Sequence, residues 1–448
     1  MSKKPIMKSN NATSRRQSED SLRLHALYRG KVQSLPKCPI RGLEDFALWY
    51  TPGVAPPCLA IRDDPARVYD YTNKGNSVAI ISNGTRVLGL GDIGPEAGLP
   101  VMEGKALLFK YLGGIDAVPL CVRTRDPTAM VETVAALEPS FGGINLEDIA
   151  QPGCFSILDQ LRPKLDIPVW HDDQQGSATV ALAGLLNALK LVGKRLTDIK
   201  LAMIGMGAAN VATYRLLKAS GIATEAIVAC DSKGTLHAGR SDIEAARDLY
   251  AEKRQVCQET NREGIVGGIA EALRGADACI AFSQPGPGTI KAEWIQAMAR
   301  DAIVFACANP VPEIWPQEAK AAGARIAATG RSDFPNQVNN SLGFPGIFRG
   351  ALDVRARTIS DEMALAAARE LAFAAQDRLS DESILPRMTD WKVPARIAAA
   401  VGMQAQEQGL ARLNLDRGTL HDTALAKIEA ARDATETLMR SGLIPPVP

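Results

Sequence analysis

Two pairs of adjacent acidic residues are the strongest chemical signal in this sequence. His171-Asp172-Asp173 follows the apolar stretch 167–170, which predicts a short buried strand, and Glu147-Asp148 follows the apolar run 141–146. Neighbouring carboxylates repel each other unless a cation or a proton lies between them. Helix capping is the alternative, because Asp and Ser are preferred where helices begin. Four carboxylates at two strand ends favour a site for a hard divalent metal ion over two simple caps.

A lysine upstream of these acids is a second candidate for chemistry. Residues 102–112 predict a helix with Lys105 in its first turn, where a positive charge is unfavourable for the helix dipole. The placement indicates another role for Lys105, and a solvated surface lysine is the alternative. The preceding string 89–94 has the form G-x-G-x-x-G, but Pro95, Gly98 and Pro100 argue against a helix that begins at its last glycine. Residues 78–82 and 87–90, joined by Asn-Gly-Thr, predict a β-hairpin.

A better nucleotide-binding signature lies in the second half of the chain. A strand at 200–204 is followed by Gly205-Met-Gly207-Ala208-Ala-Asn210 and a helix at 211–218. In this context the first glycine permits a tight turn and the second lets the backbone approach a pyrophosphate. Asn210 stands where a third glycine is usual. The next strand, 225–230, ends at Asp231, which suits bonding to a ribose diol.

Polar loops follow the later strands, 278–282 and 302–306, and one aromatic side chain lies in a rigid loop near the start. Asn309, Asn339 and Asn340 are candidate amide donors to a carboxylate ligand, because ligands bind at the strand ends of parallel sheets. Turn-forming asparagines are the alternative. Tyr50 lies in the Pro- and Gly-containing loop 49–57, and a core aromatic is the simpler interpretation of it.

Composition excludes several classes of function. The chain has 448 residues, 46% of them hydrophobic and 23% charged, with a formal net charge of +1. This balance gives no electrostatic reason for binding to nucleic acid or an anionic membrane. The eight scattered cysteines predict reduced thiols, and no apolar run approaches the roughly 18 residues that span a bilayer. Without a signal-peptide pattern, we expect a cytoplasmic protein.

The elements that must position these residues alternate between strands and helices, which predicts an α/β fold. We expect a disordered tail at 1–20, an α/β N-terminal substrate domain at 21–165, and a Rossmann-type doubly wound NAD(P)-binding domain at 166–390. A helical C-terminal segment at 391–448 should pack back on the first domain or on a dimer partner.

Taken together, these residues strongly resemble the malic enzyme family in its shorter prokaryotic form, from about residue 25 to about 400. The shared strings are 50–55 (YTPGVA), 86–94 (RVLGLGDIG), 100–105 (PVMEGK), 147–148 (ED), 171–176 (HDDQQG), 308–310 (ANP), 339–340 (NN) and 344–346 (FPG). The resemblance implies oxidative decarboxylation of L-malate to pyruvate and CO2, with NAD or NADP reduced and Mg2+ or Mn2+ required. It also implies a homodimer or a higher homo-oligomer.

The resemblance also assigns roles to residues. Glu147, Asp148 and Asp173 resemble the metal ligands. Lys105 resembles the general base, which requires a lowered lysine pKa, and Asp172 would orient it or relay its proton. The remaining roles fall to Tyr50 as the acid that protonates C3 of enolpyruvate, to Arg86, Asn309 and Asn340 in substrate binding, and to Gly205, Gly207, Ala208, Asn210, Asp231 and Asn309 in cofactor binding.

Two questions stay open at this point. The same site is compatible with an oxaloacetate decarboxylase or a malolactic-type enzyme that retains NAD, and a non-catalytic NAD-sensing protein is the alternative from a different class. Asp231 favours NAD over NADP because it repels a 2′-phosphate, although Ser232-Lys233 beside it could compensate. The expectation therefore leans slightly to NAD.

Overall fold

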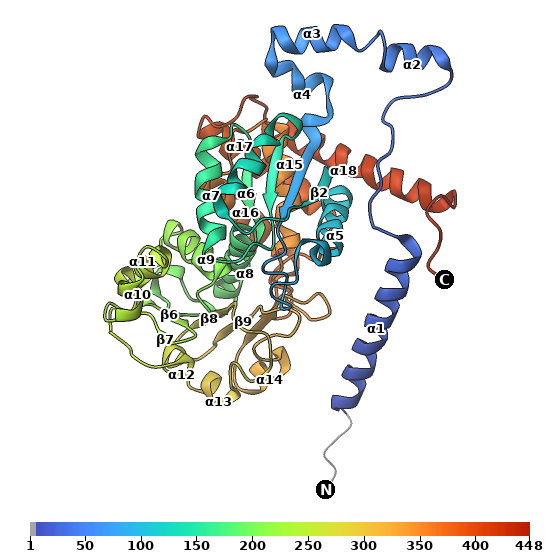
Figure 1. The fold of residues 1–448 in the computed structure, drawn as a ribbon. Coiled ribbons are helices and arrows are strands. Elements are labelled where there is room, and N and C mark those ends of the chain that lie inside the picture. Colours follow the sequence, from blue (N-terminus) through green and yellow to red (C-terminus); the bar gives the residue numbers. More distant parts are fainter. Residues whose placement is uncertain (1–5) are drawn as a thin grey trace.

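The computed structural model describes residues 6–448 and contains two parallel sheets (Figure 1). The first sheet has four strands in the order β2-β1-β3-β4: β1 (Ser77–Ser82), β2 (Asp116–Cys121), β3 (Gly143–Leu146) and β4 (Val169–His171). Every pairing in it is parallel. The intervening helices are α5 (Pro95–Gly113), α6 (Pro127–Ala136) and α7 (Gly153–Lys164). All six residues of β1 are buried, as expected for a central strand covered on both faces.

The second sheet has six strands in the order β10-β9-β8-β5-β6-β7, which confirms the Rossmann-type arrangement. The strands are β5 (Leu201–Ile204), β6 (Ile227–Asp231), β7 (Gly234–Thr235), β8 (Ala278–Ala281), β9 (Ile303–Ala306) and β10 (Ile326–Thr329), and only β7 runs antiparallel to its neighbour. Its helices are α8 (Ser177–Val192), α9 (Ala208–Ala219), α10 (Ser241–Ala245), α11 (Ala251–Glu259), α12 (Ile269–Leu273), α13 (Ala292–Gln296) and α14 (Pro316–Ala321).

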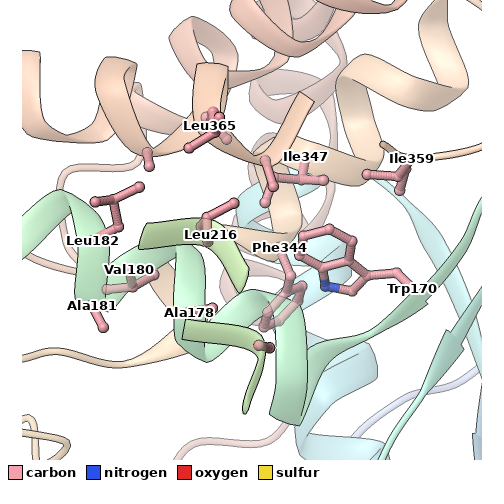
Figure 2. Close-up of a cluster of buried hydrophobic side chains, with 14 of the residues drawn as sticks. Trp170, Ala178, Val180, Ala181, Leu182, Leu216, Phe344, Ile347, Ile359 and Leu365 are labelled. Atoms are coloured by element: carbon pink, nitrogen blue, oxygen red, sulfur yellow. The ribbon is translucent and has the colours of Figure 1, made fainter. Parts of the chain in front are cut away.

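The C-terminal helices tie the two sheets together. They are α15 (Phe344–Asp353), α16 (Asp361–Phe373), α17 (Val393–Glu407) and α18 (Arg417–Arg440). α15 packs on α5, where Phe344 lies 4.6 Å from Phe109 between ring centroids, and α18 also packs on α5. Figure 2 shows Trp170, Leu216 and Ile347 in one cluster although they come from different parts of the chain. One continuous core therefore joins the domains.

An arm of four helices precedes the first strand: α1 (Ile6–Tyr28), α2 (Leu43–Trp49), α3 (Ala55–Asp63) and α4 (Val68–Tyr71). In Figure 1, α2 and α3 project from the body of the molecule. Large apolar side chains on this arm are exposed to solvent, including Leu43 at 83% and Trp49 at 47%. Short 3₁₀ helices on the arm and in the two domains occupy Pro65–Arg67, Asn73–Asn76, Glu138–Ser140, Leu196–Asp198, Thr224–Ala226, Asn340–Leu342 and Gln376–Arg378. No described helix is long and apolar enough to cross a membrane.

The predicted hairpin at 78–90 is wrong. β1 pairs in parallel with β2 on one side and β3 on the other, so neither of its edges is left for a hairpin partner. Residues 87–91 instead form a turn closed by one isolated bridge from Val87 to Gly91. The Asn-Gly signal marks a change of direction at the end of a parallel strand.

The start of the helix that carries Lys105 is also different from the prediction. α5 begins at Pro95, directly after Gly94, and continues through Pro100. Proline is well suited to a first helical position, where its missing N–H is not needed. Lys105 therefore lies in the middle of α5, and the helix-dipole reasoning for its placement does not apply.

Two predicted boundaries also shift. β4 belongs to the first sheet, so the substrate domain extends to at least His171 and not only to 165. α1 begins at Ile6, within the segment expected to be disordered, and residues 6–28 contain neither Gly nor Pro to interrupt it. The first five residues of that predicted tail lie outside the described residues.

Candidate active site

Lys105 lies at the centre of a buried cluster of carboxylates. Its side chain leaves α5 and places Nζ 2.5 Å from Glu147 Oε1 and 2.5 Å from Asp172 Oδ2. Nζ also lies 4.6 Å from the centroid of the Phe344 ring at the start of α15. Only 7% of Lys105 is exposed. The lysine is therefore not a solvated surface residue, and three separate elements fix its ammonium group.

The two acidic pairs meet because their strands are neighbours. Glu147-Asp148 follows β3, Asp172-Asp173 follows β4, and β3 and β4 pair in parallel. The carboxyl ends of parallel strands lie at the same edge of a sheet. There the backbone N–H of Asp148 donates to Asp173 Oδ2 over 2.7 Å. The structure thus brings all four carboxylates together with Lys105.

The turn after β4 makes its two aspartates different from each other. A π-helical turn, η4 (Asp172–Gly176), leads into α8, and such turns occur often at functional sites. Asp172 is fully buried, and its Oδ1 accepts a hydrogen bond of 2.9 Å from Trp170 Nε1. A Cβ on Gly176 would lie 1.9 Å from that same oxygen, so this position requires glycine. Asp173 keeps about a third of its side chain exposed. Asp172 is thus locked against Lys105, and Asp173 is more accessible.

Burial and mutual repulsion shift the pKa values in this cluster. Burial raises the pKa of Glu147 well above its ordinary range, and burial together with Asp173 raises the pKa of Asp148 to about 8. Burial lowers the pKa of Lys105, but Asp172 and Glu147 outweigh it and leave the lysine pKa above its ordinary value. The lowered lysine pKa required of a general base is thus not found in this arrangement. The reason is that the acids around Lys105 outnumber the cations.

The donor chemistry of the cluster suits a hard divalent ion. Within residues 6–448, no three His, Cys, Asp or Glu side chains stand together in metal-binding geometry. Glu147 bonds to Lys105 and Asn145, and Asp173 bonds to a backbone amide. Asp148 Oδ2, however, is buried without a hydrogen-bond partner. An unpaired buried carboxylate oxygen beside two further acids fits a cation ligand.

The candidate substrate residues lie near this cluster to different degrees. Asn340 Cβ would be 3.2 Å from a Cβ on Gly176, which places Asn340 against the η4 turn. The backbone N–H of Arg86 donates to the Asp148 carbonyl over 3.1 Å, while its exposed guanidinium turns to the Leu88 carbonyl. Asn339 is already used structurally, because its side chain caps the 3₁₀ helix at 340–342. Asn340 is the better amide donor of the two.

Asn309 belongs to the second domain but closely approaches the first. A Cβ on Gly89 would lie 2.3 Å from the Asn309 carbonyl oxygen, so the 86–94 loop contacts the end of β9. Glu313, which the sequence analysis did not single out, holds the loop that follows β9. Its buried carboxylate accepts hydrogen bonds from the N–H groups of Ser283 and Ala308. A buried acid in the apolar, proline-rich stretch 310–316 was the available signal for this role.

Tyr50 is not brought to Lys105 within one chain. It lies between α2 and α3 on the projecting arm, and 71% of it is exposed. It is therefore not a core aromatic, which was the simpler interpretation of its loop. The described part of a single chain leaves the acidic cluster without the tyrosine that the resemblance predicts beside it.

A cleft of about 670 Å³ opens between the two domains. Its walls come from both domains, with Thr85, Ile149 and Gln151 on one side and Leu249 and Glu252 on the other. Ile149 directly follows the metal-ligand candidates. The side-chain nitrogen of Gln151 comes within 4.0 Å of the Cβ position at Gly207, in the nucleotide turn. The cleft is thus lined by residues that neighbour both predicted sites, but by no member of the acidic cluster itself.

The candidate nucleotide turn follows β5 and leads into α9. Gly205 has φ +84°, and a Cβ there would lie 2.5 Å from the Phe282 carbonyl oxygen. Gly207 precedes α9, which begins at Ala208, four residues after the end of β5 at Ile204. Asn210 is buried and donates to the carbonyls of Ile204 and Gly205. This side chain therefore clamps the turn to its strand in place of the usual third glycine.

Asp231 stands at the end of β6 as predicted, but it is already paired. Arg240 donates to both of its carboxylate oxygens, and Lys253 Nζ lies 3.1 Å from Oδ2. Burial opposes ionisation, but these partners hold the pKa of Asp231 below its ordinary value. Lys253 is 22 positions away in the sequence, so no local pattern pointed to it. Asp231 is the counterion of Arg240 and Lys253 in this structure.

Models of two protein domains match the chain. The malic enzyme N-terminal domain matches residues 29–128, and the malic enzyme NAD-binding domain matches residues 174–406. Together these ranges cover most of the chain and agree with the order of the two sheets.

Relatives and solved structures agree with the domain matches. The bifunctional malic/malolactic enzyme of Bacillus subtilis is 49% identical over 399 residues, covering 89% of this chain and 95% of the relative. The NAD-dependent malic enzyme of Geobacillus stearothermophilus is 48% identical, covering 86% of this chain and 78% of that protein. The crystal structure of Entamoeba histolytica malic enzyme superposes with a TM-score of 0.96 at 48% identity and covers 100% of this chain and 94% of that one.

Proposed function

The chain belongs to the malic enzyme family, and on that premise we propose that it oxidises and decarboxylates L-malate to pyruvate and CO2, with reduction of NAD(P). The observation that carries the proposal is the buried Lys105 between Glu147 and Asp172, at the edge of the first sheet where β3 and β4 end. One lysine among four carboxylates suits proton transfer next to a bound cation.

Lys105 is the proposed base for the C2 hydroxyl of malate. Its neutral amine would accept the proton of the C2 hydroxyl while the C2 hydride passes to the oxidised dinucleotide, and Asp172 would then receive or return that proton through the 2.5 Å contact. Trp170 holds the other oxygen of Asp172, so the carboxylate keeps one orientation toward the lysine. The pair therefore delivers and removes a proton at a fixed point.

Glu147, Asp148 and Asp173 are the proposed ligands of Mg2+ or Mn2+. Their oxygens are the donors that such ions prefer, and the unpaired Asp148 Oδ2 supports the assignment. When bound, the ion supplies positive charge that polarises the C2 oxygen, stabilises the enolate left by CO2 loss, and offsets the carboxylates that raise the pKa of Lys105.

Substrate carboxylates are the proposed partners of Arg86 and Asn340, and Asn309 is the amide proposed between substrate and nicotinamide. The Arg86 guanidinium is exposed and contacts a backbone carbonyl, so it can rotate to take a carboxylate in a bidentate manner. Asn340 lies against the η4 turn. Asn309 lies where the two domains meet and is held there by the Glu313 loop.

The proposal further includes a homodimer in which the α2–α3 arm of one chain packs on a second copy. Phe46, Leu48 and Trp49 are about half exposed on this arm, a pattern that favours a protein interface over solvent. Tyr50 lies beside them and is 71% exposed, whereas the cluster around Lys105 has no tyrosine of its own chain bonded to it among the described residues. Packing of the arm on the partner would place Tyr50 in the partner's site, where it protonates C3 of enolpyruvate.

Complementation between two inactive variants tests the exchange of Tyr50. Lys105→Ala and Tyr50→Phe chains are unfolded together and refolded as a mixture. If Tyr50 acts on the partner's site, hybrid dimers regain one complete site, and about a quarter of the wild-type activity returns. Failure of the mixed chains to recover activity, while each variant refolds as a dimer, would place both residues in the same chain.

The overall reaction is tested by product analysis. With Mn2+ and L-malate, we expect pyruvate, CO2 and reduced dinucleotide in equal amounts. A malolactic-type reaction is the second candidate, since the Bacillus subtilis relative is named as bifunctional. Lactate formation without net dinucleotide reduction would identify that reaction, and decarboxylation of oxaloacetate alone would identify the third candidate.

A further inference from the structure

The imidazole ring of His171 is buried without a hydrogen-bond partner. His171 is the last residue of β4, and none of its side chain is exposed. Among residues 6–448, neither of its ring nitrogens has a partner. A neutral imidazole carries one N–H donor and one acceptor, and a buried polar group that stays unpaired lowers stability. A hydrophobic side chain of similar size would avoid this cost, so the ring indicates a role other than filling the core.

The Asp173 carboxylate lies close to this ring. Nδ1 of His171 is 3.8 Å from Asp173 Oδ2, beyond the roughly 3.2 Å limit of an N–H···O hydrogen bond. The same oxygen already accepts the backbone N–H of Asp148 at 2.7 Å. Because 35% of the Asp173 side chain is exposed, its carboxylate has room to turn toward the ring.

The backbone of His171 is fixed, so the ring has a fixed point of attachment. β3 and β4 pair in parallel, with His171 opposite Leu146. The backbone N–H of His171 donates to Gln175 Oε1 at 3.0 Å, which closes the η4 turn onto the strand. Of the two side chains, the partly exposed carboxylate is therefore the one that can move to form the bond.

Two consecutive residues of β4 stand in the same relation to the two aspartates that follow them. Trp170 Nε1 donates to Asp172, two positions ahead, and His171 Nδ1 approaches Asp173, also two positions ahead. Successive side chains of a strand point to opposite faces, so each ring serves a different carboxylate. Trp170 holds the aspartate that is paired with Lys105. His171 lies beside the aspartate that is a proposed metal ligand.

We propose that His171 is a positioning residue of the metal site, whose Nδ1–H donates to Asp173 Oδ2 and directs the other oxygen, Oδ1, to the divalent ion. The inference rests on the proposed function, because it requires Asp173 to be a metal ligand. Carboxylates that bind metals are themselves held by hydrogen bonds from neighbouring groups, which fix their orientation. The role requires the tautomer that carries its proton on Nδ1.

Binding of Mn2+ to the intact protein, without malate or dinucleotide, tests this role apart from turnover. Electron paramagnetic resonance gives the Kd of the wild type and of three variants. His171→Leu removes both ring nitrogens and should weaken Mn2+ binding by about 10- to 100-fold. His171→Asn places an amide N–H near the position of Nδ1, so its Kd should remain within severalfold of the wild type. His171→Gln places the amide near Nε2 and should bind Mn2+ as weakly as the leucine variant.

Trp170→Phe is the matched control. It removes the neighbouring ring N–H from Asp172, which is not a proposed metal ligand, so its Mn2+ affinity should equal that of the wild type. Equal Mn2+ affinities of the wild type and His171→Leu, or equal weakening in the asparagine and glutamine variants, would overturn the inference. If the wild type itself bound no Mn2+, the proposed metal site would be contradicted, and the inference with it.

Nuclear magnetic resonance of the wild type, labelled with ¹⁵N-histidine, gives a test that does not depend on the folding of any variant. The other three of the chain's four histidines reach the surface, so a ring N–H that exchanges slowly with water identifies His171. Its proton should lie on Nδ1, and its resonance should move downfield when Mg2+ is added and the bond to Asp173 forms. A proton on Nε2, or a resonance that Mg2+ leaves unchanged, would exclude the proposed hydrogen bond.

Discussion

Two clusters of charged side chains, one in each domain, carry opposite imbalances. Around Lys105, four carboxylates face one buried ammonium group, and only Asp173 keeps substantial contact with solvent. Around Asp231, three cations face two carboxylates, and the excess charge lies on the exposed Lys233. The unbalanced charge of the acidic cluster is buried and therefore costly without a cation, whereas the excess charge of the second cluster lies on an exposed lysine that water solvates. The comparison indicates a divalent cation for the first cluster, while the second cluster is already balanced by solvent and by its own ion pairs.

The largest expected effect comes from removing the one cation of the acidic cluster. Lys105→Ala should lower kcat by about 10²- to 10⁴-fold, the usual contribution of a general acid–base residue. Lys110→Ala is the matched control, because it lies on the same helix and bonds to Asp116 on a partly exposed surface. Steady-state rates with saturating Mn2+ and malate measure both. Normal malate oxidation by the Lys105 variant would exclude the lysine as the base.

The metal-free acidic cluster should make stability depend on pH. Folding raises the pKa of Asp148 from about 4 to about 8, so the folded chain holds a proton that the unfolded chain releases. Stability should therefore fall as the pH rises from about 5 to 8, by an amount on the order of a few kcal/mol. Unfolding midpoints in urea after removal of metal give the trend, and added Mn2+ should suppress it.

Asp148→Asn separates this cause from general effects of pH. Asparagine cannot ionise, so stability should fall less steeply as the pH rises, and the response of stability to Mn2+ should disappear. If the dependence of stability on pH were the same in this variant as in the wild type, Asp148 would be charged in the folded chain throughout pH 5 to 8. That result would contradict the raised pKa described for Asp148.

Loss of the Trp170 hydrogen bond should have an intermediate effect. Trp170→Phe keeps an aromatic ring in the core but leaves Asp172 Oδ1 without its donor, which costs about 1 to 3 kcal/mol for a bond to a charged group. Thermal unfolding should show the loss, and kcat should fall less than in Lys105→Ala. An identical melting temperature would indicate that water replaces the indole N–H.

The smallest expected effect is the different dependence of ligand binding on ionic strength at the two clusters. Lys233 is exposed, so raising the ionic strength from 0.05 M to 0.5 M should weaken NADPH binding by severalfold more than NADH binding. Mn2+ binding at the buried acids should change less over the same range. Equal salt dependence of the two dinucleotides would remove the electrostatic difference between them.

Much of the fold was predictable from local sequence. The succession of β5, the glycine turn, α9 and β6 follows from hydrophobic periodicity and from residues at fixed spacing, and the family strings identified the remainder. The sequence-based prediction failed where the pairing of distant strands determines the structure. The Asn-Gly hairpin signal at 83–84 is local, whereas β1 pairs with strands more than 30 and 60 residues away.

The residues of the candidate site could be predicted from the sequence, but their ion-pair partners and pKa values could not. The order of strands brings both acidic pairs to one edge, as their positions suggested. The partners of Asp231 and the exposure of Tyr50 depend on contacts between distant segments, so the sequence could assign Asp231 to a ribose but could not show that Lys253 occupies it. The raised pKa of Lys105 likewise results from three-dimensional crowding of acids.

Electron paramagnetic resonance of Mn2+ tests the central contrast between the clusters most directly. Titration of the metal-free protein should show one tightly bound ion per chain, lost in Asp148→Asn and unchanged in Lys233→Ala. Absence of a tight site in the wild type, or equal binding by the Asp148 variant, would contradict the interpretation of the acidic cluster as a metal site.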